Sequence, residues 1–205
     1  MDIQLNFINR SNDASNSEVV VFQQHTAGGS GELAVAWTVI RNCGQGSHHP
    51  FVFPLSLSVG ARDSDGNYTP QLQAQDGELF KMTLTPSGNQ LVPAGAGASP
   101  QEVQVLNALD RGAIDALCFR DGRLLAVKHQ VAPQQVASFQ FKPTIWIGVV
   151  SQVQAGEVMN AAILSELNTE ISLLGIASAD IVMTGGGAGP EAKPFAFELQ
   201  NIVMA

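Results

Sequence analysis

The stretch that decides the fold is AIDALCFRDGRLLAVKH, Ala113 to His129. Two apolar segments flank Arg-Asp-Gly-Arg, and Asp121-Gly122 at its centre supplies the positive φ angles of a two-residue β-turn. Each flanking segment has the length of a strand, and a charged tip between two such segments is typical of antiparallel pairing. The stretch therefore predicts a β-hairpin.

The same strand signals recur along most of the chain. IQLNF (3–7), LSLSVGA (55–61) and TIWIGVV (144–150) each place apolar side chains at alternate positions, as strands do when one face is buried. Turn-forming Gly, Pro, Asn and Asp separate these segments. We predict an all-β protein, a two-layer antiparallel β-sandwich of the jelly-roll-like or immunoglobulin-like kind, with at most one or two short helices.

A chain of 205 residues fits a single β-sandwich domain, and we predict one spanning residues 1–205. The segment 86–100 is rich in small residues and proline, so a subdivision near 86–100 is the alternative. Helical spacing of apolar residues predicts a helix over 157–168, while the alternation in 169–173 also fits a strand. Aligning the two halves of the chain indicates no internal repeat.

Composition limits the classes of partner. Hydrophobic residues make up 45% of the chain and charged residues 14%, with a formal net charge of −8 and basic residues that occur singly. Nucleic acid and anionic lipid both require clustered Lys and Arg, so neither is expected as a partner. The polar surface is supplied mostly by Gln, Asn, Ser and Thr, which repel one another less than charges do and favour self-association or sugar binding.

The N-terminus MDIQLNFINR has neither the basic start nor the apolar run of a signal peptide, and no stretch is long enough for a transmembrane helix. We therefore expect a cytoplasmic protein in which Cys43 and Cys118 are free thiols. Export without a cleaved signal, as for a secreted toxin-like protein, is the alternative localisation.

The segment IRNCGQGSHHPFVFP (40–54) carries two adjacent histidines, His48 and His49, among turn-forming residues. Glycine and proline on both sides predict that Gln45–His49 is an exposed loop tip. Neighbouring strand residues point to opposite faces, so these two side chains would need loop geometry to share a metal ion. A metal site would need further ligands from distant positions, and His25 and His129 are the other histidines in the chain.

The segment ARDSDGNYT (61–69) predicts a second hairpin tip. Its alternating oxygen donors resemble the start of a calcium loop, but the carboxylate expected downstream is missing, because position 74 is Ala74. Tyr68 lies beside Asn67 at this tip, and an exposed aromatic next to an amide is typical of a sugar contact. We predict Asn67 and Tyr68 as ligand-binding residues.

No catalytic motif was found, and no cofactor is expected. The sequence favours a non-catalytic interaction or self-assembly protein, with carbohydrate binding as a variant, whose partner is another copy of itself, another protein or a glycan. The alternative is a metal-dependent, cupin-like jelly-roll enzyme that uses the four histidines. A further alternative is a secreted toxin-like protein that is exported without a cleaved signal.

Overall fold

A computed structural model describes residues 2–26, 32–150, 153–160, 163–164 and 169–205. The described chain is all-β, with seventeen strands and one short 3-10 helix, Gly189–Glu191, so the predicted fold class is confirmed. Among the described residues, no helix is long and apolar enough to cross a membrane. Both cysteines are free.

The chain forms two compact units. The first consists of Met1–Gln24, Ala36–Leu55 and Pro143–Ala205, and the second of His25–Val35 and Ser56–Lys142. The segment 86–100 is not the boundary between them, because most of it forms a strand inside the second unit. Compactness alone does not show that a unit folds by itself, so the single-domain prediction stays a prediction.

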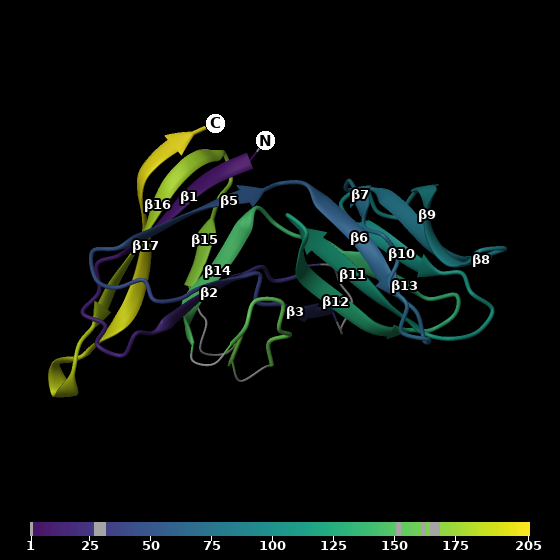
Figure 1. Ribbon diagram of the computed structural model, residues 1–205. Coiled ribbons are helices and arrows are strands. Elements are labelled where there is room, and N and C mark those ends of the chain that lie inside the picture. Colours follow the sequence, from purple (N-terminus) through teal and green to yellow (C-terminus); the bar gives the residue numbers. More distant parts are fainter. Residues whose placement is uncertain (1, 27–31, 151–152, 161–162, 165–168) are drawn as a thin grey trace. The chain divides into compact units, whose positions relative to one another are not determined.

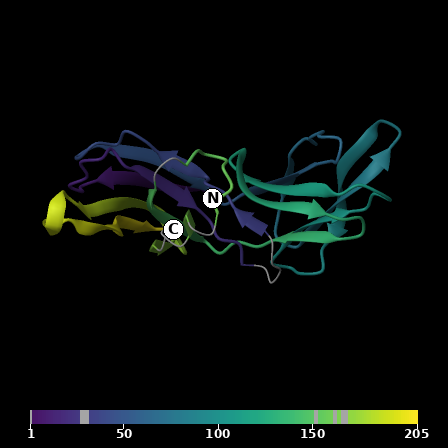
Figure 2. The ribbon, with the colours of Figure 1, turned by 90° about the horizontal axis from the view of Figure 1, so that it is seen from below.

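The first unit is a sandwich of two four-stranded sheets, in the orders β17-β16-β1-β5 and β15-β14-β2-β4 (Figures 1 and 2). Figure 1 shows β16, from the C-terminal end of the chain, beside β1 from the N-terminal end, with β17 on the other side of β16. The strands are β1 (Asp2–Asn9), β2 (Glu18–Phe22), β4 (Thr38–Ile40), β5 (His48–Pro54), β14 (Thr144–Val150), β15 (Thr169–Ser172), β16 (Ile176–Gly186) and β17 (Lys193–Met204).

The second unit is a sandwich of a four-stranded sheet, β13-β10-β8-β9, and a five-stranded sheet, β3-β12-β11-β6-β7. The predicted hairpin of Ala113 to His129 is confirmed as β11 and β12, with positive φ angles at Asp121 and Gly122. The strands are β3 (Glu32–Ala34), β6 (Leu57–Arg62), β7 (Leu72–Ala74), β8 (Glu78–Thr85), β9 (Gly88–Ala96), β10 (Val103–Asn107), β11 (Ile114–Arg120), β12 (Arg123–Val131) and β13 (Val136–Phe139).

Alternation creates a separate core in each unit. In β1 the odd-numbered residues are buried and the even-numbered ones face outward. Each large apolar side chain removed from water stabilises its unit by about 1.5–3 kcal/mol. The largest fully buried side chains are Phe7, Phe22, Trp37, Ile40, Phe53, Ile145 and Ile147 in the first unit, and Phe80, Met82, Ile114, Leu125 and Phe139 in the second.

The predicted helix over 157–168 is largely wrong where it can be compared. Residues 157–160 are not helical and 163–164 are, while 161–162 and 165–168 lie outside the described residues. The strand interpretation of the segment that follows is confirmed by β15, which pairs with β14 and buries Ile171. Pairing with β14 provides hydrogen-bond partners for the backbone N–H and C=O groups of this short segment, many of which would have no partner in an isolated helical turn.

Candidate functional site

The adjacent histidines lie on a strand and not on a loop tip. The turn ends at Gly46, and both His48 and His49 belong to β5, where they pair with Ile8 and Phe7 of β1. Both side chains are exposed, as expected, but the loop prediction for them is wrong. On a strand they point to opposite faces, so they cannot bind one metal ion together.

The other two histidines belong to the second unit, and each already has a partner. The His25 ring contacts the carbonyl oxygen of Ser138 through Nε2 at 2.6 Å, and His129 Nδ1 lies 3.1 Å from Asp115 Oδ2. In the described part of the chain, no group of three or more His, Cys, Asp or Glu side chains could hold a metal ion. The described geometry therefore gives the metal-dependent alternative no support.

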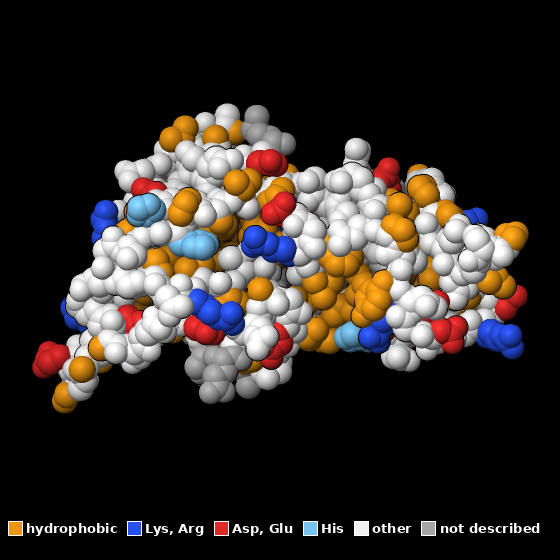
Figure 3. Space-filling model, viewed as in Figure 1, with side chains coloured by type: hydrophobic (Ala, Val, Ile, Leu, Met, Phe, Trp, Pro, Cys, Tyr) orange, Lys and Arg blue, Asp and Glu red, His pale blue; other side chains and the backbone are white. Residues whose placement is uncertain are grey.

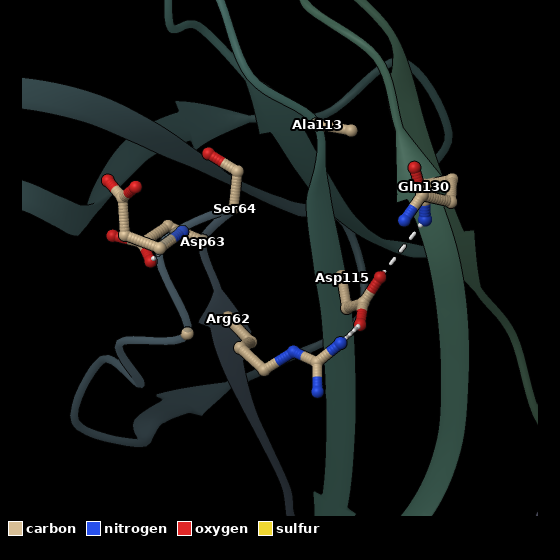
Figure 4. A pocket seen from close by; sticks show the side chains of 8 residues that line it. Arg62, Asp63, Ser64, Ala113, Asp115 and Gln130 are labelled. Carbon is tan, nitrogen blue, oxygen red and sulfur yellow. Dashed lines mark hydrogen bonds and ion pairs between the residues drawn. The ribbon is translucent and has the colours of Figure 1, made fainter.

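A polar cleft lies at one end of β6 in the second unit. It has a volume of about 480 Å³ and is lined by 62–66, by Ala113 just before β11 and Asp115 within it, and by Gln130 of β12. Figure 4 shows Asp63 and Ser64 on one side and Asp115 and Gln130 on the other, with Arg62 reaching toward Asp115. The pairing of β6 and β12 with β11 brings these distant segments together.

Asp115 is the centre of one polar network in the cleft. Its side chain is 5% exposed and pairs with Arg62 Nη2 at 2.7 Å and with His129. It also accepts a 3.0 Å hydrogen bond from the backbone N–H of Gln130. Burial raises the pKa of Asp115, but the Gln130 hydrogen bond and the neighbouring His129 and Arg62 outweigh it, so the pKa lies below the ordinary 3.8. The carboxylate is therefore ionised at neutral pH.

Asp63 organises the opposite wall. Its Oδ1 accepts hydrogen bonds from the backbone amides of Asp65 at 3.0 Å and Asn67 at 2.8 Å, while Oδ2 accepts from the side-chain amides of Asn67 and Asn89, both at 3.1 Å. Burial raises the pKa of Asp63, but the hydrogen bonds from Asn89 and Asn67 outweigh burial, so the pKa lies below the ordinary 3.8. Both oxygens already serve the turn, which explains the calcium-like sequence without an ion.

The two predicted ligand-binding residues lie beside this cleft in different roles. Asn67 donates its side-chain N–H groups to Asp63 and so orders the wall, and its part in ligand binding stays a prediction. Tyr68 is 66% exposed, and the Arg62 guanidinium carbon lies 6.0 Å from its ring centroid. The sequence prediction missed Arg62 and Asp115, although an Asp inside the apolar run AIDALCF was a signal.

The Asp115 network predicts a loss of stability in acid. A folded-state pKa below the unfolded value means that Asp115 stabilises the protein above pH 3.8, and that this contribution is lost as the pH falls through the lower folded-state pKa. We expect Asp115→Asn to lower the free energy of unfolding at neutral pH by about 1–3 kcal/mol and to make it less dependent on pH. Urea unfolding at neutral pH and below pH 3.8 measures both effects.

The control for this prediction is Asp110→Asn, which changes an exposed aspartate outside the network. It should follow the wild type at each pH. Equal acid sensitivity in wild type and Asp115→Asn would contradict the assigned role of Asp115, since other carboxylates with lowered pKa values, such as Asp63 and Asp180, would then carry the effect.

Charges elsewhere on the surface are dispersed. On the face that Figure 3 shows, Lys and Arg side chains do not gather into one patch, and several lie next to Asp or Glu side chains. Comparison with protein-family models, with characterised proteins and with solved structures finds no match to this chain. The proposed function therefore depends on the chemistry of the cleft.

Proposed function

We propose that the chain is a non-catalytic β-sandwich interaction protein and that the cleft between β6, β11 and β12 binds a carbohydrate. The observation that carries the proposal is a pair of fixed, ionised carboxylates, Asp63 and Asp115, in opposite walls of one cleft with an exposed tyrosine beside it. Its volume of about 480 Å³ is within the range of roughly 300–1,000 Å³ typical of small-molecule sites.

Sugar hydroxyls match this surface. Asp115 Oδ1 accepts the backbone N–H of Gln130 and keeps a second lone pair for a sugar hydroxyl, and such charge-assisted bonds are stronger than neutral ones. Ser64 and the side-chain amide of Gln130 add groups that can both donate and accept. An aromatic ring such as Tyr68 packs against the apolar face of a sugar ring. An anionic ligand fits less well, because Asp115 already neutralises Arg62.

Binding is favoured over acid–base catalysis by the same pKa shifts. A general acid at neutral pH needs a raised pKa, whereas the pKa values of both Asp63 and Asp115 are lowered. The N–H groups that donate to them fix their positions, which favours recognition.

The test is a glycan array, followed by calorimetric titration of the sugar that binds. We expect Tyr68→Ala to weaken binding by about tenfold, corresponding to roughly 1.4 kcal/mol of lost stacking. Leu84→Ala is the matched control, because Leu84 is 72% exposed in the same unit and does not line the cleft. No binding to any glycan, or equal affinity in wild type and Tyr68→Ala, would overturn the proposal.

A further inference from the structure

The two units share one strand order. The sheet β17-β16-β1-β5 of the first unit corresponds to β9-β8-β10-β13 of the second, and both contain an antiparallel, a parallel and an antiparallel pair in that order. The other sheet, β15-β14-β2-β4, corresponds to β7-β6-β11-β12, antiparallel throughout; β3 is an addition in the second unit.

Chain order turns this likeness into a repeat. The strands β1, β2, β4, β5, β6, β7, β8 and β9 correspond in sequence to β10 through β17. The chain therefore passes twice through the same eight strands, over 2–96 and 103–204. Yet the first unit contains the first four strands of one repeat and the last four of the other, and the second unit contains the remaining halves.

Backbone hydrogen bonds repeat at corresponding positions, centred on Asn9 and Asn107. In each case the next amide, of Arg10 or Ala108, donates to a methionine carbonyl at 2.9 Å. The asparagine amide itself donates to the antiparallel neighbour at 3.0 Å, and its carbonyl accepts a bond of 2.7 Å. The methionines are Met183 for Arg10 and Met82 for Ala108. The partners of the asparagines are Ser47 and Gly46 for Asn9, and Gln135 and Gln134 for Asn107.

Side chains repeat as well. Asn9 and Asn107 are both buried, and the Oδ1 of each accepts a hydrogen bond from the amide two residues later. Glu18 of β2 pairs with Val150 of β14, and at the corresponding position Asp115 of β11 pairs with Arg62 of β6. Glu18 binds Arg41 at 2.8 Å as Asp115 binds His129.

The sequence itself agrees best where the chain passes between units. FVFPLSLSVG (51–60) and FQFKPTIWIG (139–148) share both phenylalanines, a hydroxyl residue, the two core aliphatics and the final glycine. Apart from His25–Val35, which belongs to the second unit, the chain leaves the first unit after Leu55 and returns to it after Lys142, within one residue of corresponding positions in these segments. The same short, proline-containing segment thus carries each repeat from one unit to the other.

We infer that the chain is a tandem duplication whose repeats have exchanged halves, and that each half also fits the complementary half of a second copy of this chain. The contacts that complete a unit, such as the β1–β16 and β2–β14 pairs, always join one repeat to the other. Exchange between two copies would reproduce these contacts and change only the hinge segments, which is why domain swapping costs little. The inference does not depend on the ligand of the cleft.

The experiment cuts the full-length protein between the repeats. A protease site is inserted between Pro100 and Gln101, two exposed residues between β9 and β10, and the folded protein is cleaved. We expect both fragments to elute together at the mass of the intact 21.6 kDa chain with an unchanged circular dichroism spectrum. Fragments that separate without denaturant would overturn the exchanged-halves inference.

A second experiment measures whether halves from two copies of the chain combine. Isotopically heavy and light cleaved proteins are unfolded in urea, mixed, refolded and weighed by native mass spectrometry. We expect heavy–light pairs at the proportion of random reassortment, and the uncut protein refolded at high concentration to yield a dimer that persists on dilution. The uncut protein with the same insertion, refolded at low concentration, is the monomeric control. Refolding without mixed pairs or dimers would overturn the fit to a second copy.

Discussion

Replacing Trp37 by alanine is expected to lower the free energy of unfolding by about 3–5 kcal/mol, a large part of the stability of a typical domain. The side chain is 1% exposed, and its ring meets Phe53 edge-on with centroids 5.5 Å apart. Truncation removes this packing and leaves a cavity between the sheets of the first unit that rigid strands cannot fill.

Urea unfolding followed by far-ultraviolet circular dichroism measures this loss without relying on tryptophan fluorescence, which the substitution itself changes. Leu84→Ala, at a position that is 72% exposed, is the control and should stay within about 0.5 kcal/mol of wild type. A comparable small effect for Trp37→Ala would mean that the first unit has no tightly packed core there.

Turn chemistry and alternation made the local structure predictable. The hairpin of β11 and β12 depends on one Asp-Gly pair whose positive φ angles few other residues adopt without strain. The same local rules failed at His48 and His49. The backbone amide of Asn9 donates to the carbonyl of Ser47, which fixes the β5 residues whose backbone N–H and C=O groups face β1. Pro50 is not one of them, so its missing N–H group removes no hydrogen bond between the two strands.

The cleft could be predicted only in part. Tyr68 and Asn67 were visible at a turn, because turn residues are contiguous in sequence. Arg62 and Asp115 meet because β6 and β11 pair in one register, and a shift of one residue would turn Asp115 to the other face. Register between strands this far apart is set by tertiary packing, which a single sequence does not specify.

The repeat escaped detection for a related reason. Strands that correspond in the structure are separated by segments of different length: 63–71 joins β6 to β7, whereas 151–168 joins β14 to β15. No single alignment offset therefore superposes the two halves, and core positions accept many aliphatic exchanges. What persists is hydrogen-bond geometry at the two asparagines.

Asn107→Ala is expected to lower the free energy of unfolding by about 3 kcal/mol, since it leaves several buried backbone groups without partners. The side chain is fully buried, donates to the carbonyls of Gly112 and Val131 at 2.9 Å each and accepts from the Leu109 amide at 3.1 Å. Val131 and Leu109 are buried, so water cannot readily replace the bonds lost there, and the cost exceeds that of an exposed amide.

The duplicated architecture sharpens this prediction, because Asn9 holds the corresponding place in the first unit. It accepts from the Ser11 amide at 2.9 Å and donates to the Cys43 carbonyl at 2.6 Å, so Asn9→Ala should cost a similar amount. Gln90→Ala removes an exposed amide and should stay within about 0.5 kcal/mol of wild type.

Calorimetry of the three variants also tests the single-domain prediction: one cooperative domain gives a single shifted transition, whereas separate units would give two, with each asparagine variant moving a different one. A loss below about 1 kcal/mol in both asparagine variants would show that these buried amides do not anchor the sandwiches.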